Sequence, residues 1–374
     1  MRSSLARLFV RSFLIVGLLA VLPAHGQAPA YLVKDINPDT PAPQVEETGA
    51  ESEGVGSLFY YVANDGTHGT EIWRTDGTPA GTFLLKDICP GACTSLPRAL
   101  TSSNGLLFFF ADDPEQGPEL WKSDGTSAGT SLVKGDLNGR QNLGGFLAPA
   151  MADAGSKLLF IAMSPAGILE LWVTDGTQGG TKAVGDAAQG FYSVPRFLAA
   201  GNGQVLFAAR GDSGWEPWVS DGTNAGTHRV ADLNPGAGNS LSENNTTPGK
   251  EAVAAPWGGF VFVADDGTHG PEVWRTDGTA GGTTLIKDIT PGSSGSSPFG
   301  FTAVNGKILF NATDPAHGSE IWATDGTAAG TALLLDVWPG SSSSDPREIT
   351  AVGSQAFFRA ADGTYGAELW ATDG

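Results

Sequence analysis

The sequence has little positive charge, almost no cysteine and, beyond its first residues, no long apolar run. Against 40 Asp and Glu stand only 21 Lys and Arg in 374 residues, which gives a formal net charge of −19. A chain this acidic offers no basic surface to a phosphate backbone, so we expect no nucleic acid partner. Glycine is abundant, with 53 copies, but it follows no three-residue period, which excludes a collagen-like chain.

The single apolar run lies at the N-terminus and predicts a targeting signal rather than a part of the folded domain. Arg2, Arg7 and Arg11 precede the uncharged stretch 12–22, and small residues follow up to Gly26. This pattern predicts a signal peptide over residues 1–26 and a secreted protein, which is extracellular, on the cell surface or periplasmic. Without a second such run, we expect no membrane insertion after cleavage.

The two cysteines, Cys89 and Cys93, are only four positions apart. In an exported chain such a pair is predicted to form a local disulfide. Two thiolates without nearby His or Cys partners cannot fill a zinc site, which makes a metal role less favourable.

One motif is repeated along the rest of the chain. Glu-x-Trp, followed two residues later by Asp-Gly, occurs seven times, with spacings of 48, 51, 46, 56, 48 and 48 residues. The tryptophans are Trp73, Trp121, Trp172, Trp218, Trp274, Trp322 and Trp370. A period near 48 with short strands inside it is typical of a propeller or a solenoid. Because the indoles recur in every unit, we expect them to pack in the core rather than to bind sugars.

Each unit contains four apolar segments separated by turn-forming residues. In the sixth unit they are Phe301–Val304, Lys307–Asn311, Glu320–Thr324 and Thr331–Val337. Asn305-Gly306 between the first two is a strong hairpin signal. Four antiparallel strands per unit indicate a blade, so the sequence predicts an all-β, seven-bladed β-propeller that forms one domain over residues 27–374.

The two ends of the repeat region predict how the ring closes. Tyr31–Pro38 matches the fourth segment of other units, such as Leu84–Pro90, whereas the sequence stops at Gly374 without that segment. We therefore expect the N-terminal strand to complete the last blade beside Glu368–Thr372, which would remove an exposed sheet edge.

The recurring Glu-Leu/Ile-Trp-x-x-Asp-Gly-Thr resembles the ELWxxDGT repeat of exported bacterial proteins. Seven copies cover nearly the whole predicted mature chain, with Pro217 and Val273 as departures at the middle apolar position. The resemblance implies a propeller-like exported repeat protein. It implies no defined reaction and no catalytic residues.

Aspartates recur in the second and fourth connections of the units, which strand parity places on one face of the disc. The second-connection acids are Asp65, Asp113, Asp266, Asp314 and Asp362. They are the weak candidates for binding Ca²⁺, which prefers carboxylate and backbone oxygens. The alternative is a solvated acidic face whose aspartates cap their own turns. The Glu of Glu-x-Trp shares a strand face with the Trp and needs a partner, either turn amides or a cation of the adjacent blade.

Departures from the repeat mark where a unique interaction surface would lie. We place such a surface on the Asp-rich face; its candidate residues are Trp215, Trp257, Trp338, Arg140 and Arg210. The stretch 236–256 inside the 56-residue spacing is read as an extended fourth connection. Neutral sequence variation in loops, which tolerate insertions, explains these departures equally well.

Together these features predict an exported, non-enzymatic propeller that acts as a binding or adhesion scaffold for an extracellular protein or a glycan, without a cofactor other than possible Ca²⁺. Two alternatives remain: a secreted propeller enzyme that acts on polysaccharide, and a spacer array in a larger surface protein. A catalytic carboxylate pair should occur once and not in seven copies, which disfavours glycoside hydrolysis by the repeated Glu.

Overall fold

The computed structural model of the protein describes residues 32–37, 51–115, 117–135, 137, 151–163, 169–184, 195–236, 238–242 and 251–374. Over these residues the fold is all-β: 27 strands form seven antiparallel sheets and no helix is present. The predicted signal peptide, residues 1–26, lies outside the described residues. Among those described, there is no helix of the length and apolarity that a membrane crossing requires.

The sheets follow one another along the chain, and we number them 1 to 7 in that order. Sheet 1 consists of β1 (Ser52–Val55), β2 (Leu58–Asn64), β3 (Thr70–Thr75) and β4 (Phe83–Lys86). Sheet 2 consists of β5 (Arg98–Ser103), β6 (Leu106–Asp113), β7 (Gly117–Ser123) and β8 (Ser131–Lys134). Sheet 3 consists of β9 (Met151–Asp153), β10 (Leu158–Met163), β11 (Leu169–Thr174) and β12 (Lys182–Ala183).

The second half of the chain repeats this plan, except at its end. Sheet 4 consists of β13 (Arg196–Gly201), β14 (Gln204–Gly211), β15 (Gly214–Ser220) and β16 (His228–Arg229). Sheet 5 consists of β17 (Ala252–Ala254), β18 (Phe260–Asp265), β19 (Pro271–Thr276) and β20 (Thr284–Lys287). Sheet 6 consists of β21 (Phe299–Val304), β22 (Lys307–Asp314), β23 (Gly318–Thr324) and β24 (Ala332–Leu335). Sheet 7 has three strands, β25 (Arg347–Val352), β26 (Gln355–Ala361) and β27 (Ala367–Thr372).

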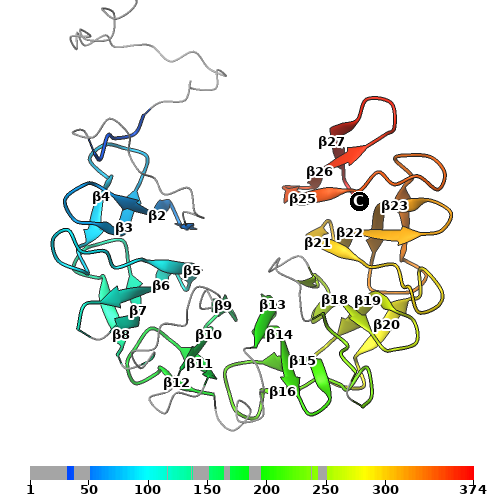
Figure 1. Ribbon diagram of the computed structural model, residues 1–374, viewed down its shortest axis with the longest axis horizontal. Helices are drawn as coiled ribbons and strands as arrows, with labels where there is room; N and C mark the ends of the chain where they lie inside the picture. Colours follow the sequence, from blue (N-terminus) through cyan, green and yellow to red (C-terminus); the bar gives the residue numbers. More distant parts are fainter. Residues whose placement is uncertain are drawn as a thin grey trace, which may run out of the picture.

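Every sheet is a simple meander in which sequential strands pair. The first strands of successive sheets contact one another, from β1 and β5 through to β21 and β25. Figure 1 shows the sheets arranged side by side along an open arc, with sheet 1 and sheet 7 at its two ends. This propeller-like arrangement confirms the predicted fold class at the level of an all-β array of meandering sheets.

Asn305-Gly306 closes the first hairpin of sheet 6 where the sequence predicted it, and Asn202-Gly203 closes that of sheet 4 in the same way. Asn305 and Gly306 have φ of 48° and 77°, and Asn202 and Gly203 have φ of 55° and 78°. Two successive residues with positive φ form the turn that matches the right-handed twist of a tight hairpin. The Asn202 side chain also donates to the carbonyl oxygen of Gly259 in sheet 5, at 3.0 Å, and so joins two sheets.

The core is divided into layers, each of which fills the space between two successive sheets. Between sheets 1 and 2, Ile72 and Leu85 pack against Phe109 and Trp121, all at most 7 % exposed. Between sheets 5 and 6, Val273 packs against Phe310 and Trp322 in the same way. The repeated tryptophan therefore faces the preceding sheet, which agrees with the packing role that its recurrence predicted.

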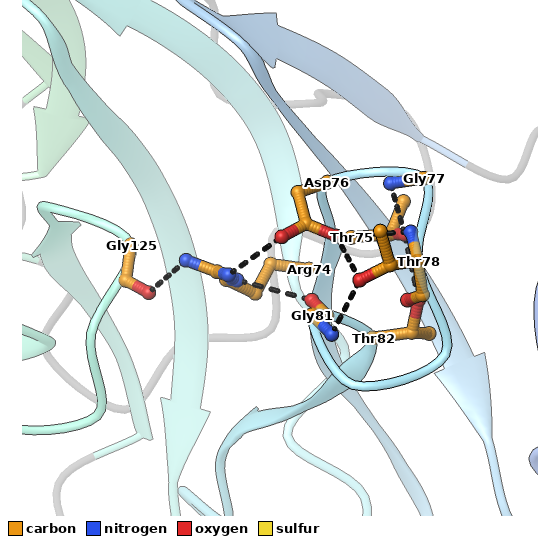
Figure 2. A network of polar contacts seen from close by, with 8 residues as sticks. All are labelled: Arg74, Thr75, Asp76, Gly77, Thr78, Gly81, Thr82 and Gly125. Carbon is orange, nitrogen blue, oxygen red and sulfur yellow. Dashed lines mark hydrogen bonds and ion pairs between the residues drawn. The ribbon is translucent and has the colours of Figure 1, made fainter.

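In sheets 1 to 6 the Asp-Gly-Thr that follows the repeated tryptophan closes the turn between the third and fourth strands, as Figure 2 shows for sheet 1. Asp76 Oδ1 accepts the amide and the hydroxyl of Thr78, at 2.9 and 2.7 Å, and Thr78 Oγ1 accepts the amide of Gly81. Gly81 lies so close to this carboxylate that a Cβ there would stand 2.0 Å from Asp76 Oδ1. The motif is thus a self-contained hydrogen-bonded turn that only glycine can complete.

In sheets 1, 2 and 5 a long side chain that follows the repeated tryptophan reaches the next sheet. Arg74 Nη1 donates to the carbonyl oxygen of Gly125 in sheet 2, at 3.0 Å (Figure 2). Lys122 reaches Gly176 at 2.7 Å and Arg275 reaches Gly326 at 3.0 Å. These contacts tie neighbouring sheets together at the edge of the array opposite to the acidic connections.

The predicted pairing of the N-terminal segment with the last sheet is not shown. Residues 32–37 lie beside sheet 1 (Figure 1), where Lys34 Nζ donates to the carbonyl oxygen of Thr82. No strand pairs with the outer edge of β27 among the described residues. The reason is that the ends of the arc stand apart, so a segment that packs on sheet 1 does not reach sheet 7.

Candidate functional site

In sheets 1, 4, 5 and 6 the second and fourth connections touch one another, as strand parity predicts. A Cβ on Gly69 would lie 1.8 Å from the carbonyl oxygen of Cys93, and one on Gly318 would lie 2.4 Å from that of Ser342. Gly69 and Gly318 also have φ near 70°, a conformation that glycine tolerates best. We call the face formed by these paired connections the rim.

Beneath the rim lies the Glu of the Glu-x-Trp motif, which is buried in sheets 1, 2, 4, 5 and 6. Glu320 is fully buried and accepts the amides of Val337 and Ser344, each at 2.9 Å, and the hydroxyl of Ser344 at 2.6 Å. Glu71 and Glu272 accept the corresponding donors of their own sheets. Burial raises the pKa of Glu320 despite these hydrogen bonds. Sequence analysis expected either turn amides or a cation as the partner of this carboxylate, and the structure shows turn amides. The carboxylate therefore holds the fourth connection in place.

Sheet 4 departs from this arrangement at Glu216. Its Oε2 accepts the amide of Leu233 and the hydroxyl of Ser240, at 2.9 and 2.8 Å, but its buried Oε1 has no hydrogen-bond partner. Asp232, next to Leu233, also has a buried Oδ1 without a partner, a feature that it shares with the equivalent Asp87, Asp288 and Asp336 and that does not set sheet 4 apart. Burial, with a smaller contribution from the charge of Asp232, raises the pKa of Glu216 to about 7.

Three second connections carry an identical Asp–His pair at the surface of the rim. Asp65, Asp266 and Asp314 each contact the Nδ1 of the histidine three residues later, at 2.7 to 2.8 Å. These histidines, His68, His269 and His317, are 35 to 39 % exposed. The hydrogen bond to the carboxylate raises the pKa of each imidazole.

Tyr365 occupies the same loop position in sheet 7. Asp362 Oδ1 accepts the amides of Thr364 and Tyr365 at 2.8 Å, as Asp65 Oδ1 accepts those of Thr67 and His68. The tyrosine is 77 % exposed. Sequence reasoning did not single it out, although Asp-Gly-Thr-Tyr-Gly aligns directly with Asp-Gly-Thr-His-Gly.

The five aspartates considered for calcium lie at the end of the second strand, or directly after it, in five different sheets and cap their own turns. Asp113 Oδ1 accepts the amide of Glu115, and Asp65, Asp266, Asp314 and Asp362 accept two amides each. Across the described part of the chain, no three or more His, Cys, Asp or Glu side chains are grouped so as to hold a metal ion. The structure therefore does not bring these acids together.

The structure also separates the tryptophans proposed as an interaction surface. Trp257 lies in the turn between β17 and β18, not after a fourth connection, because β17 is formed by residues inside 236–256. Its indole covers Gly326 in the third connection of sheet 6, so it stands on the face opposite to the rim. Trp338 covers Gly363 and does lie on the rim.

Trp215 and Arg210 pair directly across β14 and β15 near the rim. Trp215 is partly buried against the layer between sheets 4 and 5, and Arg210 is exposed. Arg140 lies outside the described residues. The five candidates thus do not form one patch. Cys89 and Cys93 are joined as a disulfide within the fourth connection of sheet 1.

Comparisons with known proteins give a likeness of fold. No family model matches the sequence, and no curated protein matches it. A puromycin hydrolase structure is 15 % identical, with a TM-score of 0.42, over 90 % of this chain and 53 % of that chain. The acylaminoacyl peptidase of Pyrococcus horikoshii is 13 % identical, with a TM-score of 0.37, over 86 % and 50 %. This chain therefore spans about half the length of these proteins.

A third structure covers a propeller domain alone. The β-propeller domain of the Trilobed protease from Pyrococcus furiosus is 11 % identical, with a TM-score of 0.40, over 87 % of this chain and 95 % of that one. At these identities the comparisons describe the fold and assign no reaction to this chain.

The expectation of a non-enzymatic scaffold is nevertheless contradicted by these findings and is withdrawn. The similar structures include puromycin hydrolases, a prolyl endopeptidase and an acylaminoacyl peptidase, all of them enzymes. A polysaccharide-cleaving enzyme and a spacer array fit these comparisons no better. The error arose because repetition of residues among blades was taken to exclude catalysis, whereas a propeller can be one part of an enzyme.

Proposed function

We propose that this chain is the substrate-recognition part of an exported propeller-containing protein with ELWxxDGT-type repeats, and that its rim binds a polypeptide. The signal-like residues 1–26 and the seven motif copies support export and the family resemblance. The peptidases named above act on peptides, and a polypeptide ligand is the only part of that activity carried into the proposal. No cleavage step is assigned to the described residues.

The observation that carries this proposal is the series of exposed rings on the rim. His269, His317 and Tyr365 occupy the same loop position in sheets 5, 6 and 7, and His68 occupies it in sheet 1. Aromatic rings with a polar tip provide contact area together with directed hydrogen bonds, and they are enriched at interfaces. Because an aspartate fixes Nδ1 of each imidazole, Nε2 is left to face a ligand.

Charge defines which polypeptide fits. The chain carries a net charge of −19, and three of its aspartates lie on the rim, each in contact with one of the three imidazoles. Such a field attracts cationic ligands and speeds their association. The proposed ligand is therefore a basic, extended peptide segment that lies across several rim loops.

Binding of lysine-rich and arginine-rich peptides, measured by fluorescence anisotropy with and without added Ca²⁺, tests the proposal. Replacing His269, His317 and Tyr365 together by Ala is expected to weaken binding at least tenfold. Trp257→Ala, on the opposite face, is the matched control and should bind as the wild type does. Equal binding by the triple variant, or binding of glycans but not of peptides, would refute the proposal.

We also infer that the array closes into a ring of seven blades in solution. The support is the open edge of β27 together with the fourth-strand motif in residues 32–37. Closure removes a sheet edge that would otherwise pair with other chains. Small-angle X-ray scattering should give the distance distribution of a compact disc, and a distribution matching the open arc would contradict closure.

A further inference from the structure

The N-terminal segment contacts sheet 1 in the way that a fourth strand contacts the next sheet. Lys287, at the end of β20, donates to the carbonyl oxygen of Thr331 in sheet 6, at 2.7 Å. Lys34 donates to the carbonyl oxygen of Thr82 in sheet 1, also at 2.7 Å. Thr82 and Thr331 hold the same position in their Asp-Gly-Thr turns, so the two lysines make equivalent contacts.

A second contact repeats on the rim side. The Oδ1 of Asn234, which follows the fourth strand of sheet 4, would lie 2.8 Å from a Cβ on Gly267 of sheet 5. The Oδ1 of Asn37 would lie 3.2 Å from a Cβ on Gly66 of sheet 1. Two matched contacts at opposite ends of the segment show that residues 32–37 occupy the place of a fourth strand from a preceding sheet, although no sheet precedes sheet 1 in the described part of the chain.

Among the described residues, sheet 7 is the sheet without such a strand, and its outer residues are exposed where their counterparts are buried. Ile72, Val273 and Ile321 precede the repeated tryptophan and are fully buried by the following sheet. Leu369 holds the same position in β27 and is 76 % exposed. Glu368 is exposed as well, whereas Glu320 is fully buried under amides of its fourth connection.

We propose that β27 is the docking site for residues 32–37 of the same chain, and that the Glu368 carboxylate accepts the N–H groups of Ile36 and Asn37. The assignment follows from sheet 1, where Glu71 accepts the amides of Ile88 and Cys89 after Leu-Leu-Lys-Asp. Residues 32–37 repeat that order as Leu-Val-Lys-Asp-Ile-Asn. Because the segment already holds sheet 1, its docking would bring Leu369 against sheet 1.

The register follows from the complete sheets. Ile72 pairs with Lys86 and Val273 pairs with Lys287. The docked segment therefore places Lys34 opposite Leu369. Directly opposed residues of antiparallel strands have Cα atoms about 4.5 to 5.5 Å apart, a spacing that a disulfide can bridge.

A double variant, Lys34→Cys with Leu369→Cys, tests the docking site in the full chain. Under mild oxidation we expect more than half of the monomer to form an internal cross-link, seen as faster migration on a non-reducing gel. Lys34→Cys with Leu335→Cys is the control, because Leu335 is an exposed leucine of β24 that does not face the vacant position. Absence of the internal cross-link would overturn the proposal, as would cross-linking only between two molecules, which would mean a second copy supplies the strand.

Hydrogen exchange separates the role of Glu368 from closure itself, on which it depends. The amides of Ile36 and Asn37 should exchange at least tenfold faster in Glu368→Gln than in the wild type. Glu320→Gln is the matched control and should leave these two amides unchanged. If the cross-link forms but exchange is the same in Glu368→Gln, closure stands and the role of Glu368 is wrong.

Discussion

The hydroxyl oxygen of Ser344 lies 2.6 Å from Oε2 of Glu320, although the two residues are 24 positions apart. The contact joins the third strand of sheet 6 to the end of its fourth connection. Ser95 and Ser296 make the same contact with Glu71 and Glu272. In these three sheets the buried carboxylate holds the fourth connection, which leads to the following sheet, against the third strand.

Removal of that carboxylate should be costly. Glu320→Ala leaves the amides of Val337 and Ser344 and the Ser344 hydroxyl buried without an acceptor, so we expect a loss of about 3–5 kcal/mol in the free energy of unfolding. Urea denaturation followed by tryptophan fluorescence measures it. Glu348→Ala, at an exposed glutamate of β25, should cost much less, and an equal loss in both variants would contradict this account.

Neutralising Glu216, in contrast, should stabilise the protein at high pH. Because burial raises its pKa to about 7, the folded state holds a proton that the unfolded state releases near pH 4.5. Stability from this site is therefore greatest below pH 4.5 and falls as the pH rises to 7. Glu216→Gln should raise the free energy of unfolding at pH 8 by roughly 1–3 kcal/mol and leave it unchanged at pH 4.

Glu272→Gln is the control for that experiment, because both oxygens of Glu272 already accept hydrogen bonds. It should destabilise the protein at pH 8. A loss of stability in Glu216→Gln at that pH would show that its Oε1 has a partner after all.

The Arg74 link between sheets 1 and 2 can be tested by matched substitutions. Arg74→Ala removes the hydrogen bonds to Gly125 and Gly81, and should cost about 1–2 kcal/mol. Arg74→Lys should recover part of this loss, because Lys122 makes the same contact with Gly176. Thermal unfolding provides the measurement, and an unchanged melting temperature in Arg74→Ala would argue against the link.

The Asp–His pairs should make stability depend on pH near neutrality. Each histidine has its pKa raised by the hydrogen bond to its aspartate, so its contribution is complete below pH 6.5 and disappears as the pH rises through the raised value. His317→Gln should therefore lower the melting temperature at pH 5.5 and leave it nearly unchanged at pH 9. A difference that grows with pH would have the wrong sign.

The repeat alone was sufficient to predict the strands, because hairpin and turn residues punctuate each unit. Asn305 and Gly306 lie in the predicted turn, and the expected segment Glu320–Thr324 falls within β23. The turn amides around Glu320 were one of two predicted partners. The prediction that the aspartates of the second and fourth connections lie on one face was correct, because strand parity depends only on counting strands.

Sequence reasoning failed where the repeat is irregular. The place of Trp257 was wrong because β17 has only three residues, Ala-Val-Ala, whose pattern does not stand out from the surrounding loop. The lone Oε1 of Glu216 could not be predicted either, because the motif there keeps its Glu and Trp and departs only at Pro217. Tyr365 was missed because it shares its loop position with the histidines but is a different type of residue.

The Arg74–Gly125 link bears on how such a chain can lengthen by gene duplication. The donor belongs to one copy and the acceptor carbonyl to the next, and the turn that presents the carbonyl folds on its own hydrogen bonds. A tandem copy of about 48 residues would thus bring both halves of the joint with it, and would fit its neighbours from the first generation without compensating mutations.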